Sequence, residues 1–176
     1  MTTPLRPIIL GDNNLWPLRL DTTEGDGILL VDSGIDFDLP DGTATWDALA
    51  MQAGALGFAP ADVRVVIVTH EHIDHAAFAA RWVSLGATVI CGRAAIPALA
   101  LGRDSNEVQR EPRFAELRRH GAPDALLDGF RGMRGTRALR WDAAPADALM
   151  AAEDRPTFRL AGDRTLLVIP APGHTP

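Results

Sequence analysis

Apolar residues along the chain follow two patterns, one typical of strands and one typical of helices. Short apolar runs, often β-branched, predict strands at residues 8–10, 15–20, 28–31, 63–68, 88–90, 157–160 and 165–169. Apolar residues at helical spacing predict helices at residues 46–56, 76–85, 94–101, 112–119 and 124–130. The last two strands are expected to form a hairpin. This mixture and order of elements indicates an α/β domain.

One helix boundary is predicted from local chemistry. The helix at residues 112–119 is expected to begin at Pro112, because proline is favoured in the first turn of a helix. Its last residues, Arg118 and Arg119, place positive charge at the negative end of the helix dipole.

Composition narrows the class of protein. With 176 residues, 47% of them hydrophobic and 23% charged, the chain is expected to form one soluble globular domain. The formal net charge of −6 argues against a nucleic-acid partner, which requires a basic face. No apolar stretch reaches the roughly 18 residues of a membrane span, and the first residues do not resemble a secretory signal. We therefore expect a cytoplasmic protein with no membrane partner.

A cluster of metal-ligand residue types follows the strand predicted at 63–68, in the segment Thr69-His70-Glu71-His72-Ile73-Asp74-His75. Two imidazoles two residues apart point the same way in an extended chain. Composition alone would give this arrangement with a probability of roughly four in ten thousand, so we interpret it as a metal site rather than as surface histidines. Imidazole and carboxylate suit Zn, Fe or Mn. The zinc-protease motif is excluded, because Asp74 occupies the position of its second histidine.

A second candidate ligand, His174, lies near the end of the chain. It follows the sequence Ile-Pro-Ala-Pro-Gly, in which proline and glycine make a rigid turn after a predicted strand. A lone histidine in such a turn is a weak signal, but together with residues 69–75 it becomes a plausible remote ligand.

Three segments resemble motifs of one family. The segment 69–75 resembles the His-x-His-x-Asp-His signature of the metallo-β-lactamase superfamily. The segment 172–176, Pro-Gly-His-Thr-Pro, resembles a motif of its glyoxalase II and lactonase-like branches. The segment 30–34, Leu-Val-Asp-Ser-Gly, resembles the Asp-(Thr/Ser)-Gly found early in these proteins. The resemblance implies an αββα four-layer sandwich with a dinuclear metal site between its two sheets.

The resemblance also implies which residues bind metal. His70, His72 and His174 would hold the first ion, while Asp74 and His75 would help to hold the second. Two Zn²⁺ ions are expected, with Fe or Mn as alternatives.

The sequence departs from the family pattern in two ways. Ala76 and Ala77 stand where the family usually has Gly-Gly. The family's bridging Asp and last His lie in the second half of its fold, so five of the seven expected ligands are present. We therefore expect residues 1–176 to be the truncated, N-terminal part of such a domain, with a helical insertion at about 94–147.

The implied activity is hydrolysis. A metal-bound hydroxide would attack an ester, thioester, lactone or amide of a small-molecule substrate, and Asp74 would orient it and accept its proton. The 176-residue chain alone is expected to be inactive. One alternative is a redox protein on the same scaffold, either a persulfide dioxygenase or a diiron protein. The diiron pattern often has an acidic residue where His72 stands, which disfavours it. The other alternative is an inactive metal-binding fragment.

Other polar residues have more ordinary interpretations. Asp32 is equally consistent with support for a metal-binding histidine and with a turn at a strand end. His120 is interpreted as a cation at a helix end rather than as a ligand. Cys91, the only cysteine, cannot form an internal disulfide and is expected to be a small buried side chain.

Overall fold

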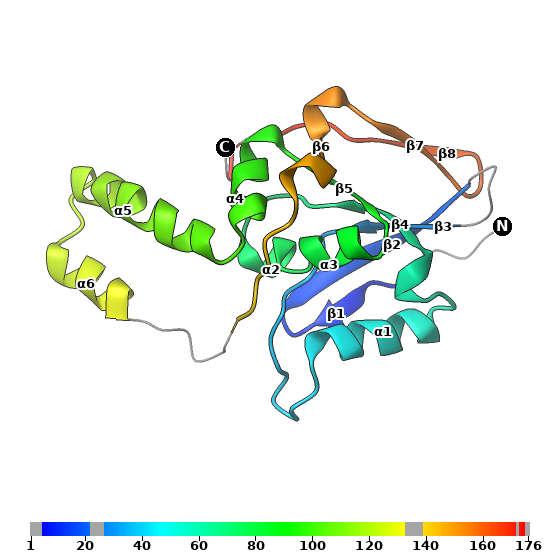
Figure 1. Ribbon diagram of the computed structural model, residues 1–176, viewed down its shortest axis with the longest axis horizontal. Helices are drawn as coiled ribbons and strands as arrows, with labels where there is room; N and C mark the ends of the chain where they lie inside the picture. Colours follow the sequence, from blue (N-terminus) through cyan, green and yellow to red (C-terminus); the bar gives the residue numbers. More distant parts are fainter. Residues whose placement is uncertain (1–4, 22–26, 133–138, 172, 175–176) are drawn as a thin grey trace.

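The computed structural model describes residues 5–21, 27–132, 139–171 and 173–174 (Figure 1). Its strands are β1 (Ile8–Leu10), β2 (Asn13–Leu20), β3 (Gly27–Val31), β4 (Val63–Ile67), β5 (Thr88–Cys91), β6 (Leu149–Ala151), β7 (Thr157–Leu160) and β8 (Arg164–Leu167). Its α-helices are α1 (Thr45–Ala55), α2 (Ile73–Ala76), α3 (Ala79–Ser84), α4 (Ile96–Leu101), α5 (Asp104–Arg119) and α6 (Asp124–Gly132). Short 3₁₀ turns are η1 (Pro60–Asp62), η2 (Arg93–Ala95), η3 (Ala146–Ala148) and η4 (Ala152–Asp154).

The described strands form a mixed sheet in the order β6-β5-β4-β3-β2-β7-β8, with β1 paired to β2. Strands β3, β4, β5 and β6 are parallel to their neighbours in this part of the sheet, whereas β2 is antiparallel to β3 and to β7. The carboxyl ends of the parallel strands therefore meet at one edge of the sheet. Open α/β sheets usually bind ligands at this edge.

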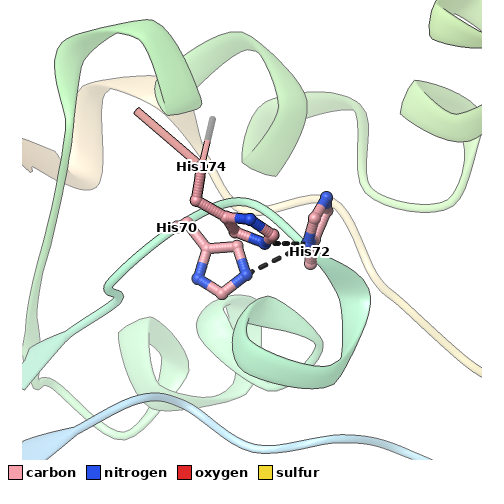
Figure 2. A group of neighbouring side chains, drawn as sticks. All are labelled: His70, His72 and His174. Carbon is pink, nitrogen blue, oxygen red and sulfur yellow. Dashed lines mark hydrogen bonds between the residues drawn. The ribbon is translucent and has the colours of Figure 1, made fainter. Parts of the chain in front are cut away.

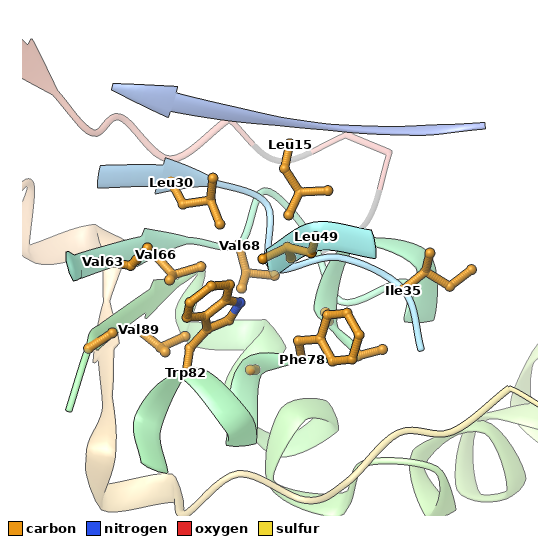
Figure 3. Packing of buried hydrophobic residues seen from close by; sticks show 14 of the residues in the cluster. Leu15, Leu30, Ile35, Leu49, Val63, Val66, Val68, Phe78, Trp82 and Val89 are labelled. Carbon is orange, nitrogen blue, oxygen red and sulfur yellow. The ribbon is translucent and has the colours of Figure 1, made fainter. Parts of the chain in front are cut away.

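Apolar side chains alternate between the two faces of the sheet. On strand β3, Ile28 and Leu30 belong to the larger core cluster, together with Leu49 of α1 and Trp82 of α3 (Figure 3). Leu29 of the same strand belongs to a smaller cluster on the opposite face. The β7–β8 hairpin contributes to this second cluster and lies on the side of the sheet away from α1 (Figure 1). The sheet thus has helices on one face and its own curled hairpin on the other.

Trp82 fixes the helical layer next to the predicted metal segment. Its side chain is fully buried, and its indole Nε1 donates a hydrogen bond of 3.0 Å to the carbonyl oxygen of Ser33. A buried indole usually has such a partner, because an unpaired N–H loses its hydration without compensation. The bond ties α3 to the residues that follow β3.

The structure corrects two helix predictions. Helix α5 begins at Asp104 rather than at Pro112, which lies inside it. A proline inside a helix removes one hydrogen bond, here to the carbonyl of Val108, and the turns on either side retain theirs. The helix predicted at 76–85 is two helices, α2 and α3, because the chain leaves helical geometry at Phe78. Strand β6 was not predicted, since its three residues, unlike the Ile-Ile-Leu of β1, include no β-branched side chain.

In the part of the chain that the structure describes, every helix is too short or too polar to traverse a lipid bilayer.

Candidate metal centre

The predicted metal segment begins where β4 ends, at the carboxyl edge of the sheet. Val68 still donates a backbone hydrogen bond to Ile90, and the chain then turns away from the sheet. His72 has extended backbone angles, φ −65° and ψ 142°, and directly precedes α2. Residues 69–71 form a bend, and the His70 and His72 side chains lie beside one another there (Figure 2).

Three imidazoles converge at this edge, as the sequence predicted. His70 Nε2 lies 3.0 Å from His72 Nδ1, and His174 Nε2 lies 3.2 Å from the same atom. One candidate ligand atom from each ring lies within 4.8 Å of the others (Figure 2). Pro172 and residues 175–176 of the predicted motif lie outside the described residues, but His174 itself lies beside the upstream pair.

The spacing of these nitrogens suits a tetrahedral metal ion. Zn–N bonds of roughly 2.0–2.1 Å place two ligand nitrogens about 3.3 Å apart. The two observed separations, 3.0 and 3.2 Å, are close to that distance. A single Nδ1 facing two Nε2 atoms cannot form a full hydrogen bond with both, whereas one metal ion accepts a lone pair from all three. The chemistry of the donor set therefore fits a metal ion.

Burial and neighbouring charges favour the neutral form of two of these rings, His70 and His72. Burial lowers the pKa of the His70 imidazole, and electrostatic repulsion between its protonated form and the neighbouring His75, His72 and His174 lowers it further. The pKa of His72 is lowered by burial and then by His174 and Arg113. Because a neutral imidazole keeps the lone pair that binds metal, both shifts favour metal binding near neutral pH.

Asp32 orients two of the histidine rings. It follows β3, and its side chain is 11% exposed. Its Oδ2 accepts a hydrogen bond of 2.8 Å from His75 Nδ1. Its Oδ1 accepts from the Thr69 backbone N–H at 3.0 Å and from the Thr69 hydroxyl at 2.7 Å. The structure thus supports both interpretations of Asp32: it contacts a histidine, and it lies at a strand-end turn with φ 66°.

The Thr69 hydroxyl extends this arrangement to His70. The hydroxyl donates its proton to Asp32, so it accepts the hydrogen bond from His70 Nδ1, 3.1 Å away. That contact places the proton of His70 on Nδ1 and leaves the Nε2 lone pair facing His72. One carboxylate therefore fixes the tautomer of His75 directly and that of His70 through Thr69.

Asp74 and His75 lie next to the three-histidine group without belonging to it. His75 Nε2 is 3.3 Å from Asp74 Oδ2, and the ring centroid of His75 is 4.2 Å from that of His70. The Asp74 side chain is 41% exposed. Among the described residues, the only set of three or more converging donors is His70, His72 and His174. The role of Asp74 and His75 at a second ion therefore stays a prediction.

One residue that supports the site has no signal in the sequence. Asn13, at the start of β2, donates a hydrogen bond of 2.8 Å from its side chain to the carbonyl oxygen of Asp74. It lies 61 residues from Asp74, and no local pattern links two positions so far apart. This bond ties the β1–β2 hairpin to the first turn of α2.

Two residues assigned to other roles are found away from the ligand group. His120 follows α5 and contacts Glu116 Oε1 at 2.9 Å, so it lies at a helix end and not among the ligand group. Cys91 is buried, and this burial raises the pKa of its thiol to about 11, with the charges of Glu153 and Glu71 adding to the effect. A thiol with such a pKa is unreactive near neutral pH.

Comparison with known proteins agrees with the motifs. The chain is similar to a metallo-beta-lactamase family protein from Thermus thermophilus, with 22% identity, a TM-score of 0.62, and coverage of 97% of this chain and 52% of that one. It is also similar to a B3 metallo-beta-lactamase with an active site glutamic acid, with 20% identity, a TM-score of 0.52, and coverage of 89% and 45%. At these identities the likeness shows the fold alone.

The chain spans about half the length of the two solved structures, 52% and 45%. No curated protein sequence matches it. The family model of the metallo-beta-lactamase superfamily matches residues 19–176, which contain all five predicted ligands. The predicted fold class, a mixed α/β fold of the metallo-β-lactamase type, is confirmed. The chain belongs to the metallo-β-lactamase superfamily.

Proposed function

We propose that this protein is a zinc-dependent hydrolase that acts on the carbonyl group of an ester, thioester, lactone or amide. Superfamily membership supports a metal-dependent hydrolase in the broad sense. The observation that carries the proposal is the convergence of His70, His72 and His174 around one point. Three imidazoles with room for a further ligand are typical of catalytic zinc sites, whereas structural sites are closed by four protein ligands.

Each side chain has a separate task in this proposal. His70, His72 and His174 would hold the ion, which supplies Lewis acidity and activates water for attack on the carbonyl. Asp74 is partly exposed beside this group, so its carboxylate is available to orient a water molecule and accept its proton. Asp32 and Thr69 keep the rings in the tautomers that the ion requires.

A second metal position would be held less firmly. Asp74 and His75 are the donors that we propose for it, and two protein ligands hold a divalent ion weakly against water. We therefore expect about one equivalent of zinc in this 176-residue chain. An incompletely organised second position is expected to reduce turnover on the order of a thousandfold.

Metal analysis of the purified protein tests the proposal. We expect near-stoichiometric zinc in the wild type and in His120→Ala, and little metal in His70→Ala. His120→Ala is a matched control because it also removes an imidazole, but one at the end of α5. Ester, thioester and lactone hydrolysis should be at or near background in all three proteins, as expected for a chain whose second metal position is incompletely organised.

The results separate the alternatives. Equal metal content in all three proteins would refute the site. Iron in place of zinc, with oxygen consumption and no hydrolysis, would favour a redox protein on this scaffold. Fast hydrolysis that His70→Ala abolishes would show that the second metal position is better organised than we propose.

A further inference from the structure

A cavity of about 660 Å³ opens beside the histidine group. His70 and His174 line it, and it extends under the segment that follows β8. Its volume lies within the roughly 300–1,000 Å³ of typical small-molecule sites. Because two proposed metal ligands line this cavity, a molecule bound at the metal would extend into it.

The walls of the cavity are mainly apolar. Ile67 comes from the end of β4, Ala152 from η4, and Val168 and Ile169 from the segment after β8. Ala152 is buried, and Ile67 and Val168 are half-buried. Their exposed parts lie where an apolar ligand group would displace water, which is favourable in proportion to the apolar area covered.

Among the described residues that line the cavity, the one charged side chain apart from histidine is acidic. Glu153 is exposed, and its two carboxylate oxygens accept the backbone N–H of Arg93 at 3.0 and 2.9 Å. This contact fixes the carboxylate in place. No arginine belongs to this described lining, so nothing in it balances a negative charge on a ligand.

We propose that this cavity holds an uncharged apolar group of the substrate. The substrates would then be neutral esters, thioesters, lactones or amides that carry an aliphatic or aromatic group, and a carboxylate on that group would be disfavoured. This inference rests on the proposed function, because the metal at His70 and His174 places the reacting carbonyl at one end of the cavity.

Alkyl hydroxamates of increasing chain length test the inference without turnover. The hydroxamic acid head group is uncharged in neutral solution and binds zinc with release of its proton, and calorimetry on the zinc-loaded chain gives the dissociation constants. We expect each methylene to tighten binding about fourfold, which corresponds to roughly 0.8 kcal/mol for a buried methylene. Acetohydroxamate, the shortest member, reports on the metal site alone.

Gly92→Leu is designed to fill the cavity. Gly92 lines it, its φ is −56°, and a Cβ at this position meets no atom within 4 Å. The variant should still bind zinc and acetohydroxamate, but its affinity for alkyl hydroxamates should no longer increase with chain length. Gly54→Leu on α1 is the matched control, because a Cβ there is also unobstructed and the residue lies away from the cavity. It should behave like the wild type.

Glu153→Gln tests the charge preference. A hydroxamate with a terminal carboxylate should bind the wild type more weakly than its neutral analogue, and the variant should reduce the difference about fivefold. That ratio corresponds to roughly 1 kcal/mol, the Coulomb energy of two unit charges about 4 Å apart in water.

The outcomes distinguish the inference from the proposed function. Zinc binding with equal affinity for short and long hydroxamates would overturn the cavity assignment and leave the metal site standing. Failure to bind zinc would refute the proposed function. In that case the neutral dye N-phenyl-1-naphthylamine tests the cavity alone. Dye binding equal in the wild type and in Gly92→Leu would overturn the inference, and binding lost only in Gly92→Leu would support it.

Discussion

Replacing Asp32 by alanine should destabilise the protein more than most single substitutions at the edge of a sheet. The carboxylate accepts three hydrogen bonds, two from Thr69 and one from His75. Thr69 is exposed, so in the variant water can accept the hydrogen bonds that its N–H and hydroxyl donate to Asp32. These two bonds therefore contribute less to stability than the bond from the half-buried His75. With about 0.5–1.5 kcal/mol for each bond, the loss is about 3 kcal/mol. For a chain of this length that corresponds to a fall of roughly 6–12 °C in Tm.

The backbone conformation at Asp32 allows a second variant, Asp32→Gly, to serve as a control for this prediction. Its φ of 66° lies in the left-handed region, which disfavours alanine by about 1–2 kcal/mol and not glycine. Asp32→Gly loses the same three hydrogen bonds without that strain. The free energy of unfolding measured in urea should therefore be about 1 kcal/mol higher for Asp32→Gly than for Asp32→Ala, and well below the wild-type value for both. Ala and Gly variants within about 0.5 kcal/mol of the wild type would refute the reasoning, since surface substitutions stay within that range.

Asp32→Asn separates histidine orientation from stability. Asparagine tolerates the left-handed conformation, and its carbonyl oxygen can still accept from Thr69. Its NH₂ group then faces His75 Nδ1, which must become an acceptor, so the proton of His75 moves to Nε2. The His70 tautomer, held by the Thr69 hydroxyl, should not change. Nitrogen-15 NMR of the imidazoles distinguishes the tautomers, and an unchanged His75 in the variant would show that Asp32 does not orient it.

Two further predictions concern packing and pH. Gly34→Ala should lower the free energy of unfolding by about 2–4 kcal/mol, because a Cβ there lies 2.9 Å from a Phe78 side-chain atom and the backbone φ is 103°. Gly86→Ala has a similar φ of 86° but open space around the Cβ, so the free energy of unfolding should fall by only about 1–2 kcal/mol. Similar urea midpoints for the two variants would contradict this prediction. The pKa values of His70 and His72 are lowered below 6.5, the value of an unfolded chain. As pH falls through 6.5 the unfolded chain binds more protons, so the metal-free protein should lose stability until the folded pKa values are passed. Between about pH 7.5 and about pH 5 the urea midpoint should fall less in His70→Gln than in the wild type, and equal falls would exclude the His70 ring as the cause.

The parts of the fold that the sequence predicted well are those with a strong local pattern. The β-branched run at 63–68 is long enough to identify a buried strand, and the polar residues after it then lie at the edge of a sheet. The start of α5 was missed because residues 104–111 are mostly polar and show no helical period. Strand β6 is held by pairing with β5, a contact with no local sequence signal.

The candidate site divides in the same way. His70 and His72 are two residues apart in sequence, so their proximity is a local feature that the sequence could predict, although the chain bends at residues 69–71. The approach of His174 followed from its resemblance to a motif, because backbone geometry does not relate positions 102 residues apart. The hydrogen bonds of Asn13 and Thr69, and the apolar cavity, are formed between segments that are distant in sequence. Residue type alone gives no indication of such contacts.

Because His72 and His174 are far apart in sequence, a metal ion bound by both would also cross-link two distant parts of the chain. An ion held by both residues closes a loop of 102 residues that contains α2 to α6. Closing such a loop restricts the unfolded chain by an entropy equivalent to about 4 kcal/mol. A protease cut between α5 and α6 would therefore leave two pieces joined at the histidine group as well as along the sheet. Removing the ion with a chelator would leave the parallel pairing of β5 with β6 and the antiparallel pairing of β2 with β7 as the strand contacts that join them.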